Sequence, residues 1–208
     1  MLRNKMAPIL LFPAAVVWGM AVMMGLGIVH SYESRPGTSG RVQSEWPGES
    51  RIPFNSACRN LVLFAHPRCP CTRASIEALS RIIERCPSLV SAQVLFFQPA
   101  EGKDEWRSNE LWRQAAAIPG VRVQGDRDGI EAGRFGAETS GTVFLYDREG
   151  RLLFTGGITG GRGQYGNNAG LEAVLAYLSG ETGTRLQRHP VFGCSILDMP
   201  TETDGGRG

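Results

Sequence analysis

The chain lacks an excess of charge of either sign. Its 208 residues carry 22 Lys and Arg against 20 Asp and Glu, a formal net charge of +2, and no sustained basic stripe. Nucleic-acid-binding proteins cluster basic residues to neutralise phosphates, so nucleic acid is excluded as a partner. A fixed repeat is also absent, because glycines and prolines gather in residues 35–53, 156–170 and 202–208. The length suits one ordinary globular domain with an anchor and a linker besides.

The chain also lacks the further strand that a dinucleotide-binding motif requires. Residues 161–166 read GRGQYG, which matches the Gly-x-Gly-x-x-Gly pattern of dinucleotide-binding proteins. That pattern requires a further parallel strand with an acidic residue about twenty positions later, and the chain runs out of strands before that point. Dinucleotide binding is therefore excluded. We expect this loop either to border the candidate site, with Arg162, Tyr165 and Asn167 open to a ligand, or to be a flexible connector.

The sequence has one long hydrophobic run, near its N-terminus. Residues 7–29 carry no charge, and 23 residues in a helix are long enough to cross a bilayer core of roughly 30 Å. Arg3 and Lys5 precede the run and should stay in the cytoplasm. The sequence thus predicts a single-pass anchor in the inner (cytoplasmic) membrane over residues 1–30, with the rest of the chain on the extracytoplasmic, periplasmic side. A cleaved signal peptide is the alternative.

The remaining sequence predicts one α/β domain. Residues 31–56 are rich in Ser, Gly, Pro and Glu and are expected to be a flexible linker, residues 57–200 the domain, and residues 201–208 a disordered tail. Strands are predicted over 60–66, 92–97, 121–123, 142–146 and 152–155, and helices over 72–86, 104–117, 129–135 and 171–178. The last two strands are expected to form an antiparallel hairpin. This order predicts a mixed sheet with helices on both faces.

The chemistry-bearing motif is Cys69-Pro70-Cys71. It lies where a buried strand gives way to a helix, so backbone N–H groups and the positive end of the helix dipole should favour a thiolate. Arg68 and Arg73 add positive charge nearby, and Pro70 restricts the backbone between the two sulfurs. These features favour thiol-disulfide exchange. Two inert buried thiols, or a metal site using two thiolates, remain as alternatives.

Two longer segments carry a resemblance to a known family. Residues 61–71, LVLFAHPRCPC, followed by an amphipathic helix, resemble the active-site corner of the thioredoxin superfamily. Residues 134–150, RFGAETSGTVFLYDREG, are similar to the segment that these proteins place before and through their β-hairpin. Over residues 57–180 the chain looks most like membrane-anchored TlpA-type and peroxiredoxin-like proteins, and more narrowly like the group labelled RedB.

The resemblance implies specific roles for residues of the motif. Cys69 would be the attacking sulfur and Cys71 the resolving one, with protein or small-molecule thiols and disulfides as partners and no cofactor. Apart from the resemblance, His66 lies within reach of the motif, where an imidazolium would further favour the thiolate; the alternative is a histidine that is simply hydrogen-bonded at the end of the strand. The implied substrate-binding residues are Pro70, Arg68, Ser140, Gly141 and Thr142.

The chain departs from the family at two points. It has Cys-x-Cys where the family usually has Cys-x-x-Cys, and closing so small a ring should introduce strain. It has Ser140-Gly141-Thr142 where the family usually has a cis-proline that helps to hold a substrate peptide. Gly141 can adopt unusual backbone angles at such a corner, although it cannot supply the fixed cis bond.

Three further cysteines remain. Cys58 precedes the first strand and Cys86 ends the helix that returns from the motif, so the two should lie near the same end of the sheet, as a structural disulfide or as two free thiols. Cys194 is then the odd cysteine. It is expected to be a third redox partner, an unpaired tail thiol, or a copper ligand together with His189, Cys69 and Cys71.

The leading hypothesis is an extracytoplasmic, membrane-anchored thiol-disulfide oxidoreductase. Its alternatives are a copper-binding metallochaperone of the same fold, a thiol peroxidase in which the first sulfur becomes a sulfenic acid, and a non-catalytic interaction domain.

Overall fold

A computed structural model describes residues 7–100, 109–181, 183 and 185–197. The chain divides into two compact units, Met1–Arg35 and Pro36–Gly208. The first unit contains a single helix, α1 (Ala7–Glu33). Its Pro13–Glu33 part is 21 residues long with a mean hydropathy of 1.7, which is long and apolar enough to cross a membrane or to serve as a signal sequence. Arg3, Lys5 and the predicted tail 201–208 lie outside the described residues.

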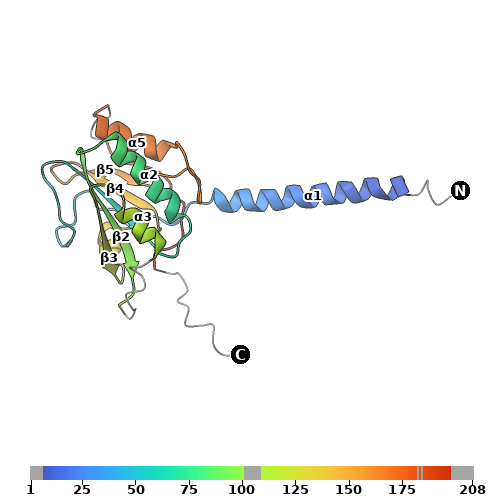
Figure 1. Cartoon of the computed structure of the whole chain (residues 1–208), viewed down its shortest axis with the longest axis horizontal. Helices are drawn as coiled ribbons and strands as arrows, with labels where there is room; N and C mark the ends of the chain where they lie inside the picture. Colours follow the sequence, from blue (N-terminus) through green and yellow to red (C-terminus); the bar gives the residue numbers. More distant parts are fainter. Residues whose placement is uncertain (1–6, 101–108, 182, 184, 198–208) are drawn as a thin grey trace. The chain divides into compact units, whose positions relative to one another are not determined.

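The second unit is built on a six-stranded mixed sheet in the order β3-β2-β1-β4-β5-β6 (Figure 1). The strands are β1 (Arg59–Ala65), β2 (Val90–Gln98), β3 (Val121–Arg127), β4 (Thr142–Tyr146), β5 (Leu152–Gly156) and β6 (Gln187–Arg188). β1, β2 and β3 run parallel, β4 is antiparallel to both β1 and β5, and β6 is parallel to β5. The predicted fold class, a mixed α/β sheet flanked by helices, is confirmed.

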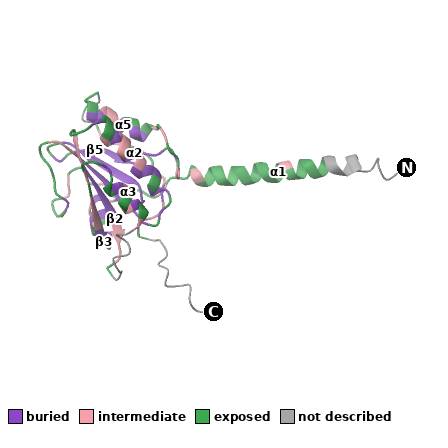
Figure 2. Cartoon of the chain, viewed as in Figure 1, coloured by how far each residue is buried: buried purple, intermediate pink, exposed green. Residues whose placement is uncertain are grey.

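The alternation of side chains along β1 separates two hydrophobic clusters. Leu61 and Leu63 pack with α2 (Thr72–Arg85), α3 (Glu110–Ala116) and α5 (Ala169–Ser179), which cover one face. Val62 and Phe64 point to the opposite face, where α4 (Ile130–Phe135) lies. The central strands are buried from both sides, as Figure 2 shows. Such two-sided burial explains why β1 reads as a continuous apolar run.

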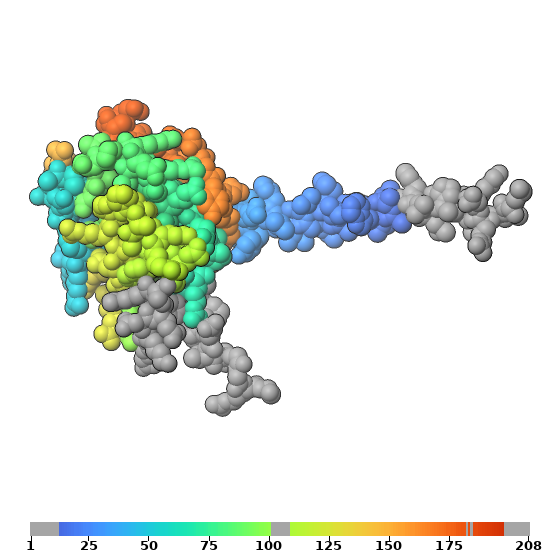
Figure 3. Space-filling model, viewed as in Figure 1, coloured from blue at the N-terminus to red at the C-terminus, as the bar shows by residue number. Residues whose placement is uncertain are grey.

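The helices α2 and α3 lie next to each other on one face of the domain (Figure 3). An ion pair of 2.9 Å between Arg73 and Glu110 joins them. The ring of Trp112 on α3 packs against Phe96 of β2, with 5.4 Å between the centroids. The structure describes only residues 109–117 of the helix predicted over 104–117, because residues 101–108 lie outside the described part.

Several elements differ in extent from the prediction. β3 is seven residues long rather than three, because its backbone pairs with β2 over the whole length although its last residues are polar. The two-residue strand β6 was not predicted, since so short a segment has no detectable period. The antiparallel hairpin of β4 and β5 is confirmed, with a register irregularity at Leu145/Tyr146.

The prediction of a flexible linker over residues 31–56 is wrong for much of its length. Ile52 is buried in the second cluster, and the ring of Trp46 lies 5.1 Å from that of Tyr146. The backbone N–H of Trp46 donates to the carbonyl of Gly150, and that of Leu152 to the carbonyl of Ser44. The domain therefore starts near Pro36 rather than at residue 57.

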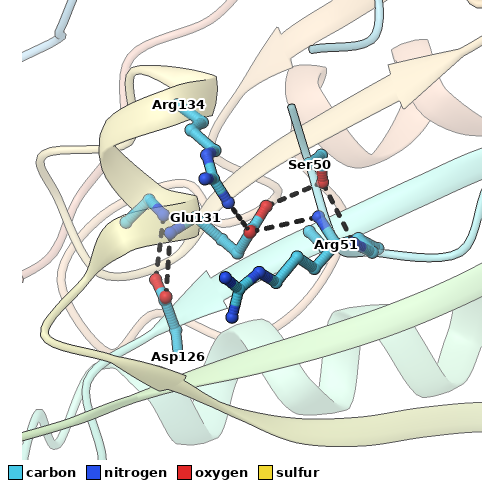
Figure 4. A network of polar contacts seen from close by, with 7 residues as sticks. Ser50, Arg51, Asp126, Glu131 and Arg134 are labelled. Atoms are coloured by element: carbon cyan, nitrogen blue, oxygen red, sulfur yellow. Dashed lines mark hydrogen bonds and ion pairs between the residues drawn. The ribbon is translucent and has the colours of Figure 1, made fainter. Parts of the chain in front are cut away.

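A partly buried polar network joins this segment to α4 (Figure 4). Ser50 donates from its hydroxyl to a carboxylate oxygen of Glu131 at 2.7 Å, and the N–H of Arg51 donates to the other oxygen at 3.2 Å. Arg134 forms an ion pair with the same carboxylate. Asp126, at the end of β3, accepts hydrogen bonds from the first backbone N–H groups of α4. The partners lie about 80 residues apart in sequence, so no local pattern reveals the network.

Candidate functional site

The corner between β1 and α2 carries the Cys-x-Cys motif. Two backbone hydrogen bonds of 3.1 Å shape it, from the N–H of Cys69 to the carbonyl of His66 and from the N–H of Thr72 to the carbonyl of Cys69. Cys71 is the N-terminal capping residue of α2 and already has helical backbone angles. Both cysteines thus lie at the N-terminus of the helix, as the sequence predicts, where unpaired N–H groups favour negative charge.

The sulfur of Cys69 is held among hydrogen-bond donors. Its side chain is 0% exposed. A hydrogen bond with the Cys71 thiol is the main cause that lowers the pKa of Cys69, to about 4. Burial opposes this shift, while the backbone N–H groups of Cys71 and Cys194 and the thiol of Cys194 add to it. Cys69 is therefore a thiolate at neutral pH.

Cys71 has the opposite protonation state. Its hydrogen bond to Cys69, its burial and the negative charge of Cys69 together raise the pKa of the Cys71 thiol, and the nearby Arg162 offsets only part of this. Cys71 therefore keeps its proton, and its S–H group donates a hydrogen bond to the sulfur of Cys69. The two cysteines of the motif form an asymmetric pair of one thiolate and one thiol.

The largest effects on Cys69 come from other groups than the expected Arg68 and Arg73. Arg73 is engaged with Glu110, and the lowered pKa of Cys69 is caused chiefly by hydrogen bonds from Cys71 and Cys194. The cation that acts on the sulfurs is Arg162, which lowers the pKa of both Cys71 and Cys194. The sequence placed Arg162 at the rim of the site but not beside the sulfurs.

His66 supports the corner through hydrogen bonds and ring stacking rather than through a positive charge. Its backbone N–H donates to the hydroxyl of Ser140 at 2.8 Å, and its Nδ1 accepts from the N–H of Arg68 at 3.1 Å. The ring stacks on Phe97 and is only 2% exposed. Burial lowers the pKa of His66 to about 4, against the effect of the Cys69 charge. The structure thus contradicts the predicted imidazolium, because the buried ring is neutral at pH 7.

Ser140, Gly141 and Thr142, predicted to bind substrate, support the corner from the sheet. The hydroxyl of Ser140 lies 2.9 Å from that of Thr72, and the N–H of Gly141 donates to the carbonyl of Phe64 at 2.8 Å. Gly141 has a φ of +95°, and none of the described peptide bonds is cis. The side chains of Ser140 and Thr142 are buried and bonded internally. Their role in holding a substrate stays a prediction, as does that of the exposed Arg68 and Pro70.

The end of the chain brings a third sulfur to the motif. The Sγ atoms of Cys69 and Cys194 lie 3.2 Å apart, although 125 positions separate the residues in sequence. The N–H of Ser140 donates to the carbonyl of Cys194 at 2.8 Å, and Thr139 and Ser195 form an antiparallel bridge. One of the predicted alternatives for Cys194, a thiol within reach of Cys69, is thus the observed arrangement.

The glycine-rich loop holds the segment around Cys194. A guanidinium nitrogen of Arg162 donates to the carbonyl of Gly193 at 2.5 Å, and Arg162 also hydrogen-bonds to the Cys194 thiol. Burial, followed by the hydrogen bond and the charge of Cys69, raises the pKa of Cys194 to about 11, against the effect of Arg162. Cys194 is therefore a thiol as long as Cys69 is a thiolate.

The predicted copper ligands do not form one group. The ring of His189 stacks on Phe154, and the backbone N–H of His189 donates to the carbonyl of Thr155 at the edge of the sheet. Within the described ranges, no cluster of three or more His, Cys, Asp and Glu side chains is arranged to hold a metal ion. The three sulfurs remain the soft donors that copper(I) prefers.

The other two cysteines lie away from these sulfurs along the chain. Cys58, just before β1, is half-buried, and Cys86, which caps the C-terminus of α2, is buried. Burial raises the pKa of the Cys86 thiol. None of the five cysteines is joined in a disulfide in the structure. The structural disulfide between Cys58 and Cys86 stays a prediction.

Sequence reasoning missed two features of the site. Thr72 donates from its hydroxyl to the carbonyl of His66 at 3.3 Å, but a threonine in the first turn of a helix reads as an ordinary helix residue. Gly193 lies so close to the carbonyl oxygen of Ser140 that an added Cβ would meet it at 1.9 Å. The only sequence signal for this close approach was the position of Gly193 directly before Cys194, the odd cysteine.

No family model matches the chain, and no curated protein matches it. Among solved structures, an uncharacterized conserved protein from Geobacillus kaustophilus has a TM-score of 0.56 and 17% identity, over 81% of this chain and 94% of that one. A hypothetical protein from Sinorhizobium meliloti 1021 has a TM-score of 0.53 and 22% identity, over 79% and 97%. A secreted disulfide oxidoreductase from Mycobacterium tuberculosis has a TM-score of 0.43 and 12% identity, over 59% and 81%, which is too distant to argue from. The first two likenesses show a shared fold and leave the activity to be argued from the site.

Proposed function

We propose that this chain is a membrane-anchored thiol-disulfide oxidoreductase of the thioredoxin superfamily that acts outside the cytoplasm through Cys69-Pro70-Cys71. The observation that carries the proposal is the position of Cys69 and Cys71 at the N-terminus of α2, with the Sγ atom of Cys194 3.2 Å from that of Cys69. The lowered pKa of Cys69 and the raised pKa of Cys71 agree with it. Thiol-disulfide exchange needs an ionised attacking sulfur and a second thiol beside it. Assignment to the TlpA-type or RedB branch rests on the sequence resemblance alone.

The proposed reaction is disulfide reduction. The Cys69 thiolate attacks one sulfur of a substrate disulfide, forms a mixed disulfide and releases the other sulfur as a thiolate. A second protein thiol loses its proton and attacks the Cys69 sulfur, which releases the remaining substrate thiolate. Two protein thiols are then joined in a disulfide, and the substrate has gained two electrons. By the resemblance, the second thiol is Cys71.

The compartment follows from the N-terminal helix. We assign residues 7–29 as an uncleaved anchor in the inner membrane, with Arg3 and Lys5 on the cytoplasmic side. The length and hydropathy of α1 support an anchor, and a signal sequence has the same properties. An oxidising compartment suits a protein that exchanges disulfides with its partners.

Turnover of oxidised glutathione by the full chain in detergent micelles, with dithiothreitol as electron donor, tests the proposal. We expect catalysis above the background rate, its loss in Cys69→Ser, and full retention in the control Cys58→Ser. A wild-type rate equal to that of Cys69→Ser would contradict the proposal. Tight copper(I) binding that is lost in Cys69→Ser and Cys71→Ser, without any turnover, would support a metallochaperone instead. Turnover of hydrogen peroxide alone would support a peroxidase.

A further inference from the structure

The C-terminal segment, residues 190–197, covers the motif. Its backbone pairs with the residues before β4: the N–H of Ile196 donates to the carbonyl of Glu138, and the carbonyl of Cys194 accepts from Ser140. Ile196 is buried in the second hydrophobic cluster. These contacts hold the segment extended along residues 138–140 and fix the position of its cysteine.

The geometry brings Cys194 within bonding reach of Cys69. A disulfide has an S–S length of about 2.05 Å, so the observed separation of 3.2 Å needs a shift of only about 1 Å to close. The segment that would move is held at both ends of the cysteine by hydrogen bonds to Ser140 and Arg162. In the resting structure these hydrogen bonds therefore hold the Cys194 sulfur beside Cys69.

We propose that Cys194 is the resolving thiol for Cys69, so that the redox disulfide of this protein is Cys69–Cys194, while Cys71 serves as the hydrogen-bond donor that keeps Cys69 ionised. This inference rests on the proposed function for the attack by Cys69, and it changes the assignment that the family resemblance gives to Cys71.

Backbone constraints disfavour Cys71 as the resolving thiol. Only Pro70 separates it from Cys69, and a disulfide across one residue closes a small, strained ring. The φ of Cys71 is −66° and its ψ is −23°, so the residue is already committed to the first turn of α2. Closing the small ring would disturb this helix start. Closing the Cys69–Cys194 bond requires no such change at the helix.

Charge changes during the reaction favour Cys194. In the resting state the Cys69 thiolate helps to raise the pKa of Cys194, and Arg162 acts against it. In a mixed disulfide Cys69 has no charge, so this contribution disappears while the guanidinium of Arg162 stays hydrogen-bonded to Cys194. The pKa of Cys194 then falls, and the thiolate needed for the second step forms beside the mixed disulfide.

The steps balance as follows. The Cys69 thiolate and a substrate disulfide give a mixed disulfide and one substrate thiolate. Cys194 loses its proton to water, its thiolate attacks the Cys69 sulfur, the bond between Cys69 and the substrate breaks, and the second substrate thiolate leaves. Because Cys69 has no exposed surface, a substrate reaches it only when the C-terminal segment moves aside, and the return of the segment brings Cys194 to the mixed disulfide.

Mapping the disulfide formed on oxidation tests the pairing directly. The reduced full chain in detergent micelles is treated with oxidised glutathione, its free thiols are alkylated with N-ethylmaleimide, and the peptides are identified by mass spectrometry. We expect a Cys69–Cys194 link with Cys71 alkylated. A Cys69–Cys71 link with Cys194 alkylated would overturn the inference and leave the proposed function intact. A chain that forms no link and no glutathione adduct at Cys69 would overturn both.

Matched cysteine variants separate the two roles. Cys194→Ser should keep the first step and accumulate the glutathione adduct on Cys69, with turnover lowered about tenfold or more because no sulfur is placed to resolve it. Cys71→Ser should still form the Cys69–Cys194 link. Cys58→Ser serves as the control and should behave as the wild type. Unimpaired turnover and no adduct in Cys194→Ser would rule out Cys194 as the resolving thiol.

A variant that keeps all five cysteines tests the position of Cys194 rather than the presence of its thiol. Gly193→Ala places a Cβ against the carbonyl oxygen of Ser140 and forces the segment away from its contact. The adduct on Cys69 should then persist about tenfold longer than in the wild type, as the segment no longer presents Cys194. Circular dichroism checks that the variant is folded. An unchanged adduct lifetime in a folded Gly193→Ala chain would contradict the inference.

Discussion

At the scale of single residues, the site is governed by hydrogen bonds between sulfurs. Cys69 is fully buried, and burial alone would keep it a thiol. Donors from Cys71 and Cys194 reverse that effect, so the same contacts that ionise Cys69 keep its two neighbours protonated. Replacing either neighbour should therefore raise the pKa of Cys69, a residue that is itself untouched.

The first prediction concerns the pKa of Cys69. Cys71→Ala removes the principal donor and should raise this pKa by about 1–2 units, since a hydrogen bond to a charged group contributes about 1.5–3 kcal/mol. Cys71→Ser keeps a donor and should shift it less. The measurement is the ultraviolet absorbance of the thiolate as a function of pH, with Cys69→Ser subtracted. In the wild type the thiolate signal should persist as the pH is lowered and disappear only near pH 4. A midpoint that is the same in Cys71→Ala and wild type would contradict the assignment of the donor.

The sign of the linkage to stability follows from this lowered pKa. A group whose pKa is lower in the folded state contributes stability that is complete above its unfolded value, here 9.0, and that is lost as the pH falls through about 4. The free energy of unfolding of the wild type, relative to Cys69→Ser, should therefore rise with pH across this interval.

A second prediction concerns Gly141. Its φ of +95° disfavours any residue with a side chain, and an added Cβ would lie 3.0 Å from the hydroxyl of Ser75. Gly141→Ala should lower the free energy of unfolding by about 2–3 kcal/mol. The control is Gly163→Ala, with a φ of +66° and no atom within 4 Å of the added Cβ, which should cost about 1 kcal/mol. Urea unfolding measures both. Equal losses would mean that the contact with Ser75 is relaxed without cost.

At the scale of secondary-structure elements, the N-terminal part of the second unit acts as a cover for one face of the sheet. The ring of Trp46 packs against Phe54, Phe135 and Tyr146, with centroid separations of 5.1–5.2 Å. Ile52 completes the cluster and is 3% exposed. The domain is therefore incomplete without a segment that belongs to no helix or named strand.

A truncated chain tests this role. A chain that begins at residue 57 should be much less stable than one that begins at Pro36, since burial of a large apolar side chain contributes roughly 2 kcal/mol and both Trp46 and Ile52 are lost. We expect a lower unfolding midpoint in urea and stronger binding of a hydrophobic dye. If the two chains unfold at the same urea concentration, the segment does not stabilise the domain.

The sequence predicted the elements whose patterns are local. The apolar run of β1, the helical spacing in α2 and the turn residues between β4 and β5 lie within short windows, and all three elements occur where expected. The segment over residues 37–52 was misread because its few apolar residues have no period and its hydrogen-bond partners lie far away in sequence. The position of Cys194 depends on backbone pairing with residues 138–140, and its contact with Cys69 spans 125 positions; neither composition nor spacing encodes these contacts.

At the scale of the whole molecule, the chain combines an apolar helix with an α/β domain. We predict that the full chain stays in the membrane pellet after alkaline carbonate extraction, and that a chain lacking residues 1–35 moves to the supernatant with its domain folded. The intact mass of the purified protein is the control, because a cleaved signal peptide would remove the N-terminal residues. A mature chain that lacks this segment would contradict the anchor.

The antiparallel bridge between Thr139 and Ser195 affects how this part of the protein can contact the strands of other chains. Backbone groups that would otherwise be open to a foreign strand are already satisfied by the protein's own end. If Cys69 is the attacking sulfur, as proposed, its burial beside this bridge keeps it from reacting with disulfides at random. A substrate would then have to compete with the Thr139–Ser195 pairing to reach the sulfur.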